Sequence, residues 1–380
     1  MTAAANHALI DTERLLSLFG ELVAVDSESF HERRMADVLK RKLKALGAQE
    51  LTEDGTGAKI GSDAGNLFAV FPGTMTGEPL LFSGHMDTVA PGIGKRAIRQ
   101  ADGRITSDGT TVLGADDMAG VAAILEALRA LDEQGIPRRT AELLLTTAEE
   151  AYIRGASAFD YAPVRAREAY VLDISGPAGA ASLQEPTLLS FRIVMNGRAA
   201  HAGFAPEDGA HAIAMAARLI EGTRMGRLDE NTTVNVGTIH GGKGTNIVPP
   251  QAVLEGEIRS FVHEEALAQL TALRERAQAA AAAFGGSCDF SYRQHLHAYR
   301  IAEDEPVVRR FLRVCREAGA AGTLTRTFGG SDNNAFYSHG IHGIVLSCGM
   351  YGAHTTGEYT TADDLTMAAR LVAGLMTSEE

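Results

Sequence analysis

The sequence predicts an α/β protein that carries a smaller α+β domain as an insertion. Two observations lead to this prediction. Towards both ends of the chain, helices with one apolar face alternate with short, mostly apolar strands, which is typical of a layered α/β domain. Between residues 186 and 297 the pattern changes to alternating strands and two helices, in the order β-α-β-β-α-β. We therefore expect a discontinuous domain over 1–185 and 298–380, and an inserted ferredoxin-like domain over 186–297.

The first α/β stretch begins with a helix over 11–24. Apolar residues recur on one of its faces, and Asp11 or Thr12 can cap its start. The elements expected after it are a helix over 31–46, strands over 67–71 and 79–83, a hairpin around Gly103, a helix over 116–135, a strand over 143–148, a helix near 155–160 and a strand over 169–175.

The inserted domain and the return to α/β structure follow from a second set of segments. Their sequences alternate or show a helical period, and glycine or proline often separates them. The expected elements are strands over 188–197, 232–242, 251–261 and 288–296, helices over 208–223 and 264–284, and then a helix over 305–319 and a strand over 343–349.

Composition excludes several classes of protein. The net charge of the 380 residues is −13 and no run of Lys and Arg exceeds three residues, so we expect no nucleic-acid partner. No stretch reaches the ~18 apolar residues of a membrane span. The three cysteines, Cys288, Cys315 and Cys348, are widely spaced and form neither a disulfide framework nor a zinc knuckle. The chain begins without a signal-peptide pattern, so a cytoplasmic, reducing location is expected.

Acidic residues and histidines gather where the α/β strands end. In open α/β sheets ligands bind at the carboxyl ends of the strands, so residues far apart in sequence can converge there. Singly, such residues are usually solvated or cap a helix. As a set, two histidines with several carboxylates suit two zinc-like divalent ions. The residues are His85, Asp87, Asp116, Glu149, Glu150, Asp173 and His354.

The stretch "LLLTTAEEAYIRG" places Glu149 and Glu150 side by side at the mouth of a core strand. Repulsion and desolvation disfavour that arrangement unless positive charge lies there. We expect one glutamate to ligate a metal ion and the other to stay free as a base for water. Asp87, two residues beyond His85, can accept the second N–H of that imidazole and fix its tautomer.

Nine motifs carry a resemblance to a known family. In order along the chain, "SGHMDTV", "GADDMAG", "TTAEEA", "YVLD", "GRAAHAG", "TNIVPP", "GEIRS", "FGGSDNNAF" and "GAHTTGE" resemble the dinuclear zinc hydrolases that include peptidase T, aminoacylases and glutamate carboxypeptidases. "GADD" and "GAHTTGE" are most similar to the peptidase T-like branch. The resemblance implies a catalytic domain with a mixed central sheet flanked by helices, an inserted lid or dimerisation domain, and a homodimer built through that lid.

The resemblance also implies a role for each metal-site position. His85 and Asp173 would hold one zinc ion, Glu150 and His354 the other, and Asp116 would bridge them. Glu149 matches the general base and Asp87 the partner of His85. One departure is Met118, which stands where the family usually has a lysine. That position is not a ligand, so only a local electrostatic role of the lysine is put in question.

Five further positions match residues that contact substrate in the family. His201, in the inserted domain, matches a histidine that reaches the scissile carbonyl, often from the other subunit. Asn246 and Arg259 match lid residues that hold substrate carbonyl or carboxylate groups. Gly330 and Ser331 match a backbone turn near the C-terminal end of the substrate.

The predicted function is hydrolysis of short peptides by an aminopeptidase of tripeptides or dipeptides, with two Zn²⁺ per chain and Co²⁺ or Mn²⁺ as alternative ions. An N-acyl-amino-acid deacylase or a carboxypeptidase of the same fold remains open, so the substrate is a short peptide or an N-acyl amino acid. A non-catalytic metal-binding protein is disfavoured by the free base Glu149. A nucleotide-binding protein is disfavoured because no phosphate-binding motif is present.

Overall fold

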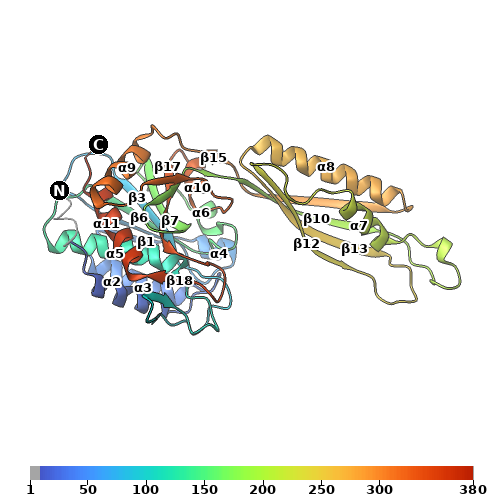
Figure 1. Ribbon diagram of the computed structural model, residues 1–380, viewed down its shortest axis with the longest axis horizontal. Coiled ribbons are helices and arrows are strands. Elements are labelled where there is room, and N and C mark those ends of the chain that lie inside the picture. Colours follow the sequence, from blue (N-terminus) through green and yellow to red (C-terminus); the bar gives the residue numbers. More distant parts are fainter. Residues whose placement is uncertain (1–8, 380) are drawn as a thin grey trace. The chain divides into compact units, whose positions relative to one another are not determined.

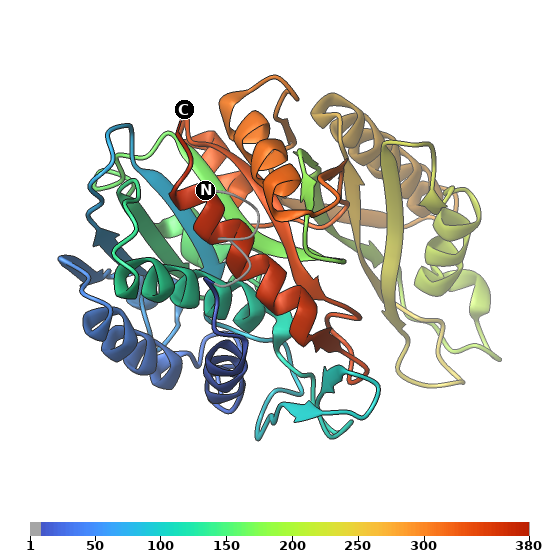
Figure 2. The same ribbon diagram turned by 60° about the vertical axis from the view of Figure 1, so that its left-hand side comes forward.

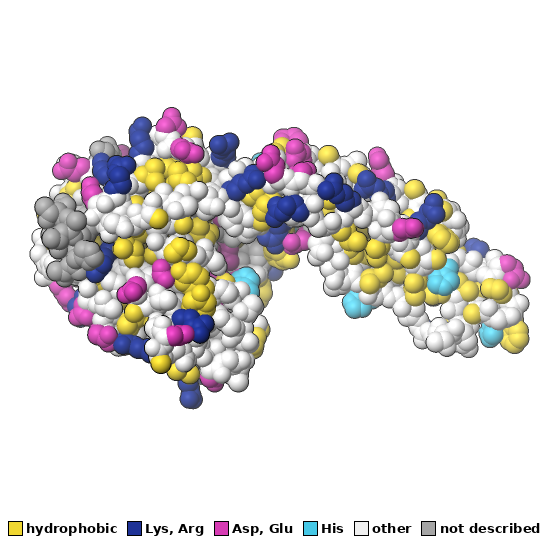
Figure 3. Space-filling model, viewed as in Figure 1, with side chains coloured by type: hydrophobic (Ala, Val, Ile, Leu, Met, Phe, Trp, Pro, Cys, Tyr) yellow, Lys and Arg dark blue, Asp and Glu magenta, His cyan; other side chains and the backbone are white. Residues whose placement is uncertain are grey.

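The computed structural model describes residues 9–379, which form two compact units. The larger unit contains the chain up to Gln184 and from Arg300 onward, and the smaller unit is Glu185–Tyr299. Whether the smaller unit acts as a lid or a dimerisation domain stays a prediction. Within the described residues, no helix combines the length and the apolar composition needed to cross a membrane. On the face of the larger unit that Figure 3 shows, acidic and basic side chains are interspersed.

A mixed sheet of eight strands forms the centre of the larger unit, in the order β1-β2-β6-β3-β7-β17-β8-β16 (Figure 1). The four central strands β6, β3, β7 and β17 are parallel, whereas β2 and β8 run antiparallel to their neighbours β6 and β17. This confirms the predicted mixed sheet. The strands are β1 (Glu50–Glu53), β2 (Leu67–Phe71), β3 (Leu80–His85), β6 (Ala141–Thr146), β7 (Glu168–Ser175), β8 (Ala180–Ser182), β16 (Thr323–Thr325) and β17 (His342–Met350).

Helices flank this sheet. α5, α9 and α11 pack against β17, and α5 also contacts β3, β7 and α2 (Figure 2). The apolar stripe of α2 is fully buried, which explains why its sequence has a helical period. The helices are α2 (Thr12–Val23), α3 (Arg33–Ala45), α4 (Thr56–Ile60), α5 (Ala115–Glu133), α6 (Arg154–Ala158), α9 (Pro306–Ala318), α10 (Asn333–Ser338) and α11 (Ala362–Met376).

Two small sheets complete the larger unit and its connections. The hairpin expected around Gly103 is present as β4 and β5, and β18 pairs with β5. β9 and β15 pair where the chain passes from one unit to the other. Their bounds are β4 (Ile98–Arg99), β5 (Arg104–Thr106), β18 (Tyr359–Thr361), β9 (Gln184–Glu185) and β15 (Tyr299–Arg300).

The smaller unit is an antiparallel sheet of five strands with two helices, in the strand order β11-β12-β13-β10-β14. Without the short β11, this order and the β-α-β-β-α-β chain path are those of a ferredoxin-like domain. The elements are β10 (Thr187–Asn196), the 3₁₀ turn η1 (Pro206–Asp208), α7 (Ala212–Glu221), β11 (Gly226–Arg227), β12 (Thr232–Gly241), β13 (Gln251–Ser260), α8 (His263–Ala282) and β14 (Ser287–Leu296).

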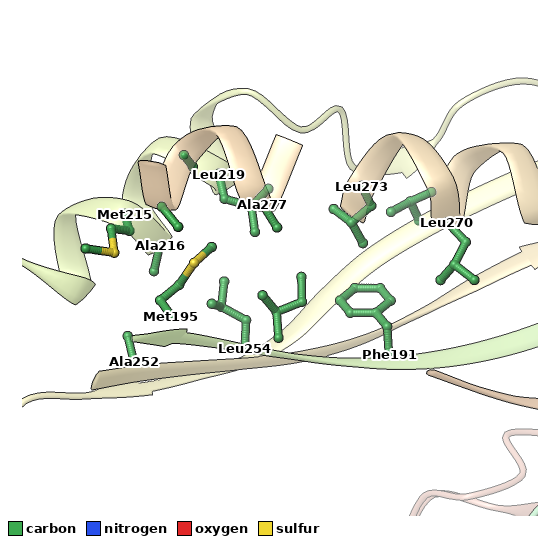
Figure 4. Packing of buried hydrophobic residues seen from close by; sticks show 14 of the residues in the cluster. Phe191, Met195, Met215, Ala216, Leu219, Ala252, Leu254, Leu270, Leu273 and Ala277 are labelled. Atoms are coloured by element: carbon green, nitrogen blue, oxygen red, sulfur yellow. The ribbon is translucent and has the colours of Figure 1, made fainter. Parts of the chain in front are cut away.

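The core of the smaller unit lies between its sheet and its helices (Figure 4). Alternate residues of β10, including Phe191 and Met195, point to the helices, which is why this strand alternates in sequence. Leu219 of α7 and Leu273 of α8 meet them from the other side. This unit therefore has a hydrophobic core of its own.

Candidate active site

Seven polar residues singled out from the sequence lie at one edge of the large sheet. The four central strands are parallel, so their carboxyl ends meet at that edge. The residues are His85 at the end of β3, Asp87 just after it, Asp116 at the start of α5, Glu149 and Glu150 after β6, Asp173 in β7, and His354 after β17.

Asp116 lies between the two histidines. Its Oδ1 is 3.0 Å from His85 Nε2 and its Oδ2 is 3.3 Å from His354 Nε2. Glu150 Oε2 is 2.9 Å from the same nitrogen of His354, and Asp173 Oδ1 is 3.8 Å from His85 Nε2. Each oxygen of Asp116 thus faces a different imidazole, with one further carboxylate beside each ring.

Two overlapping groups of these side chains could hold a metal ion. In one, ligand atoms of His85, Asp116 and Glu150 lie within 4.8 Å of one another; in the other, those of His85, Glu149 and Asp173 do. The second group contains Glu149, which the sequence analysis predicts to be the general base and not a metal ligand. Glu149 therefore lies within reach of the same ion position as His85 and Asp173.

Burial and charge shift the pKa of most of these groups. Burial raises the pKa of Glu149, Glu150 and Asp173, and neighbouring carboxylates add to the effect. Burial also opposes charge on Asp116, but hydrogen bonds from the two histidines outweigh it and lower its pKa. Hydrogen bonds to Asp116 and Glu150 raise the pKa of His354 to about 10. The four carboxylates therefore favour positive charge between them.

Glu150 supplies a test of whether a cation fits. Its Oε1 is buried and has no hydrogen-bond partner among the described residues. A buried carboxylate oxygen without a partner is unfavourable, and a divalent cation would satisfy it. Two imidazoles with three or four carboxylates are also a donor set that zinc and similar ions accept. The residues present therefore fit a pair of divalent ions.

Asp87 contacts the His85 ring through both its backbone and its side chain. The Nδ1 of His85 lies 2.9 Å from the backbone oxygen of Asp87 and 3.4 Å from its nearer carboxylate oxygen. The carboxylate also accepts the backbone N–H groups of Glu149 at 3.0 Å and Glu150 at 3.2 Å, and the hydroxyl of Ser29 at 2.8 Å. Asp87 thus fixes both the imidazole and the glutamate pair.

The predicted strand over 143–148 ends earlier, at Thr146, for a related reason. Beyond that residue the backbone N–H groups bond to side chains instead of a neighbouring strand. Thr147 donates to Asn66 Oδ1 and Ala148 to Glu32 Oε1, at 3.1 and 3.0 Å. Glu32 is fully buried, and nothing in the sequence pattern marked it as part of this edge.

Glu358 is a second residue that the sequence reasoning missed. Its carboxylate accepts the backbone N–H of Gly114 at 2.7 Å and that of Asp116 at 2.9 Å. Burial raises its pKa to about 7. Glu358 therefore holds the turn that presents Asp116. It is the last residue of the motif "GAHTTGE", four positions after His354, so proximity to His354 was the available signal.

Gly330 and Ser331 belong to the same edge of the sheet. The next residue, Asp332, accepts the hydroxyl of Thr146, the last residue of β6, at 2.5 Å. Burial raises the pKa of Asp332 to about 7. Ser331 is fully buried and its hydroxyl accepts the N–H of Asn333 at 3.2 Å, so its side chain serves the turn itself.

The other three predicted residues, His201, Asn246 and Arg259, belong to the smaller unit. His201 is exposed, and its Nδ1 accepts the N–H groups of Gly203 and Phe204, both at 3.2 Å. A neutral imidazole in this position carries its proton on Nε2. The Asn246 carbonyl accepts the N–H that follows His201 in the chain, and Arg259 pairs with Glu257 at 2.8 Å.

Comparison with known proteins identifies relatives along nearly the whole chain. A Staphylococcus aureus tripeptidase structure is similar with a TM-score of 0.94 and 34% identity, and covers 97% of this chain and 99% of its own. The Bacillus cereus aminopeptidase PepT gives a TM-score of 0.90 and 38% identity, with the same coverage. The Bacillus subtilis protein YqjE is 36% identical over 97% of this chain and 99% of its own.

The family model points the same way as these relatives. The model of peptidase family M20/M25/M40 matches residues 81–378. This range includes β3 from its second residue onward, the seven polar residues at the carboxyl edge of the sheet, which we call the acidic cluster, and the whole smaller unit. The match begins just before His85 and extends beyond His354. The chain belongs to peptidase family M20/M25/M40.

Proposed function

We propose that this peptidase is an aminopeptidase of tripeptides and dipeptides that works with two zinc ions. The main support for two metal ions is the position of Asp116, whose two carboxylate oxygens face different histidines. The ligands would be His85, Asp116 and Asp173 for one ion, and Asp116, Glu150 and His354 for the other. Nitrogen and carboxylate donors suit zinc, with Co²⁺ and Mn²⁺ as alternatives.

Glu149 would act as the general base. It is buried, and among residues 9–379 no donor forms a hydrogen bond to its carboxylate. Its backbone is held by Asp87. When bound, divalent ions make water more acidic and polarise a carbonyl group. The free carboxylate of Glu149 would accept the proton of the attacking water and then deliver it to the leaving amine.

Substrate would be oriented by groups of both units. The Nε2 proton of His201 is free of the bonds that hold Nδ1, so it can donate to the scissile carbonyl oxygen as negative charge develops there. Asn246 and Arg259 would hold other carbonyl or carboxylate groups of the peptide, and the backbone of Gly330 and Ser331 its C-terminal end. We further propose a cytoplasmic homodimer in which the smaller unit is the lid and the dimer contact.

A comparison of three similar substrates tests whether the protein is an aminopeptidase. The purified protein with bound metal is assayed on Ala-Ala-Ala, Ala-Ala and acetyl-Ala, each detected by release of free alanine. An aminopeptidase should cleave the first two and leave acetyl-Ala untouched. Preferential cleavage of acetyl-Ala would overturn the proposal in favour of a deacylase.

Metal dependence gives the second test. Exhaustive chelation should abolish activity, and zinc should restore it. Elemental analysis should find about two zinc ions per chain, and Asp116→Ala should lower the occupancy of both. Arg96→Ala, a change of an exposed cation outside the cluster, is the control and should leave the metal content unchanged. Full activity after complete metal removal would contradict the mechanism.

A further inference from the structure

Helix α9 has an unusual basic face. Its sequence "PVVRRFLRVCREA" spaces Arg309, Arg313 and Arg316 by four and three residues, so they lie along one side. The opposite side, with residues such as Phe311 and Val314, is buried in the larger unit. The chain as a whole has a net charge of −13, so three neighbouring arginines on one helix face form a positively charged patch on an acidic protein.

These arginines line a cavity of about 600 Å³, which we call the arginine cavity. That volume lies in the range of small-molecule sites. All of its lining belongs to the larger unit. The residues are Glu168, Pro306, Arg309, Arg310, Arg313 and Arg316.

The positive charge of the arginine cavity is compensated only in part. Arg310 forms an ion pair with Glu168 and donates to the hydroxyl of Tyr170 at 3.1 Å. Within residues 9–379, no carboxylate forms an ion pair with Arg309, Arg313 or Arg316. Arg313 donates to two neutral oxygens, the hydroxyl of Ser378 at 2.8 Å and the carbonyl of Glu379. Three guanidinium groups are therefore available to an anion.

Arg310 adds a second, independent observation. Its side chain is 3% exposed, and its Nε is buried without a hydrogen-bond partner among the described residues. A buried donor on a charged group is unfavourable without an acceptor. Guanidinium groups present two parallel N–H bonds that match the oxygens of a phosphate group. Arg310 also lines the arginine cavity, so an anion bound there would add to the compensation of its buried charge by Glu168.

The arginine cavity lies far from the acidic cluster. Glu168 is the first residue of β7, and Asp173 lies near the other end of the same strand. Five steps of an extended strand separate them by roughly 17 Å, at about 3.3 Å per residue. The cavity is thus at the amino edge of the sheet, opposite the proposed metal ligands, and its occupant would not contact them.

We propose that the arginine cavity binds the phosphate group of a small molecule, either free phosphate or a phosphate monoester. A phosphate carries up to two negative charges and several acceptor oxygens, which matches three uncompensated guanidinium groups better than a single carboxylate does. The volume of about 600 Å³ leaves room beside the phosphate for the rest of a monoester. The site is separate from the peptidase reaction.

Calorimetric titration of the full-length, metal-loaded protein tests the proposal at fixed ionic strength. The probes are inorganic phosphate and glycerol 3-phosphate. The cavity variant combines Arg309→Gln, Arg313→Gln and Arg316→Gln. A matched control with the same change of net charge combines Arg218→Gln, Arg224→Gln and Arg276→Gln, which are exposed positions of the smaller unit.

We expect the cavity variant to bind at least about tenfold more weakly than the wild type, and the control to bind like the wild type. Phosphate bound at the metal centre would remain in the cavity variant, so the comparison isolates the cavity. Peptidase activity should be unchanged in both. Tighter binding of glycerol 3-phosphate than of phosphate would identify a monoester as the ligand, and equal binding would identify free phosphate.

Equal affinity in the wild type and the cavity variant, or an equal loss in the control, would overturn the proposal. If the triple variant does not fold, Arg309→Gln alone replaces it, because Arg309 is exposed at the start of α9. That single change should weaken binding of the probe by at least about threefold. No change of affinity in a folded Arg309→Gln protein would count against the site in the same way.

Discussion

The carboxylate of Asp87 accepts the backbone N–H of Glu149 at 3.0 Å, and its other oxygen accepts that of Glu150 at 3.2 Å. One buried side chain thereby positions both acidic residues that follow β6. The backbone oxygen of Asp87 also lies 2.9 Å from Nδ1 of the His85 imidazole. Asp87 therefore connects the proposed base with two proposed metal ligands without itself belonging to either group.

Asp87→Ala should impair catalysis and metal binding together. The change leaves two backbone N–H groups without their acceptor and loosens the glutamate pair. We expect kcat and metal affinity each to fall roughly 10–100-fold, the usual effect of losing a group that orients ligands. Steady-state kinetics and elemental analysis measure the two quantities. Asp87→Asn, which keeps one acceptor oxygen, should lie between the wild type and Asp87→Ala; wild-type behaviour of Asp87→Ala would refute the positioning role.

The adjacent glutamates should respond differently to the same substitution. Glu149→Gln should keep both metal ions and lose about 10²–10⁴-fold in turnover, because only the base is removed. Glu150→Gln should weaken the ion that His354 also binds. Metal content per chain, measured beside kcat, separates the two effects. Loss of a metal ion from Glu149→Gln, or an unchanged rate, would mean that the roles of the pair have been exchanged or misassigned.

Glu358→Ala should destabilise the turn before Asp116. It leaves the N–H groups of Gly114 and Asp116 buried without an acceptor, at about 1–3 kcal/mol for each group. We expect a lower free energy of unfolding in urea and weaker metal binding, because Asp116 is no longer held. The exposed Glu303→Ala serves as the control and should change neither quantity. If Glu358→Ala unfolds and binds metal like the control, the turn does not depend on this carboxylate.

His201→Ala should reduce turnover and leave the metal content unchanged. All proposed metal ligands lie in the larger unit, and His201 lies in the smaller one. Loss of one donor to a developing oxyanion typically lowers kcat roughly 10²–10³-fold. Steady-state kinetics with saturating zinc measures the turnover, and elemental analysis measures the metal content. A fall in metal content would show that His201 acts on the metal site and not on the substrate.

Subunit mixing tests whether His201 acts on the partner's site. Inactive His201→Ala and Glu149→Ala proteins are combined under conditions in which the proposed homodimers would exchange subunits. If each site takes Glu149 from one chain and His201 from the other, a mixed dimer contains one intact site, and activity should reappear. Native mass spectrometry verifies that mixed dimers form. Mixed dimers without activity would restrict His201 to its own chain or exclude it from catalysis.

Sequence periodicity predicted the main elements of both units because their burial follows regular periods, as in α2 and β10. It also predicted which residues would meet at the carboxyl edge, since parallel strands align their ends. It could not predict Glu32 or Glu358. Their importance comes from bonds to backbone groups far along the chain, at Ala148 and Asp116. Such contacts leave no local period, so only the folded arrangement reveals them.

The same limit explains the use of Asp87. Spacing suggested a contact between its carboxylate and the His85 ring, but not that the same carboxylate would hold the glutamate pair. The end of β6 at Thr146 leaves the N–H groups of Glu149 and Glu150 without a strand partner, and the Asp87 carboxylate satisfies them. Backbone donors that leave a sheet need acceptors, and a buried aspartate at that edge is well suited to provide them.

The discontinuity of the larger unit has a consequence for synthesis of the protein. β17 and His354 follow the whole smaller unit in the chain, whereas β3, β6 and β7 precede it. A nascent chain that emerges amino end first therefore exposes His85, Asp116 and Glu150 long before their last companion is translated. The smaller unit can form its own core during that interval. The central strand β17 then has to insert between β7 and β8, so the acidic cluster is completed only at the end of translation.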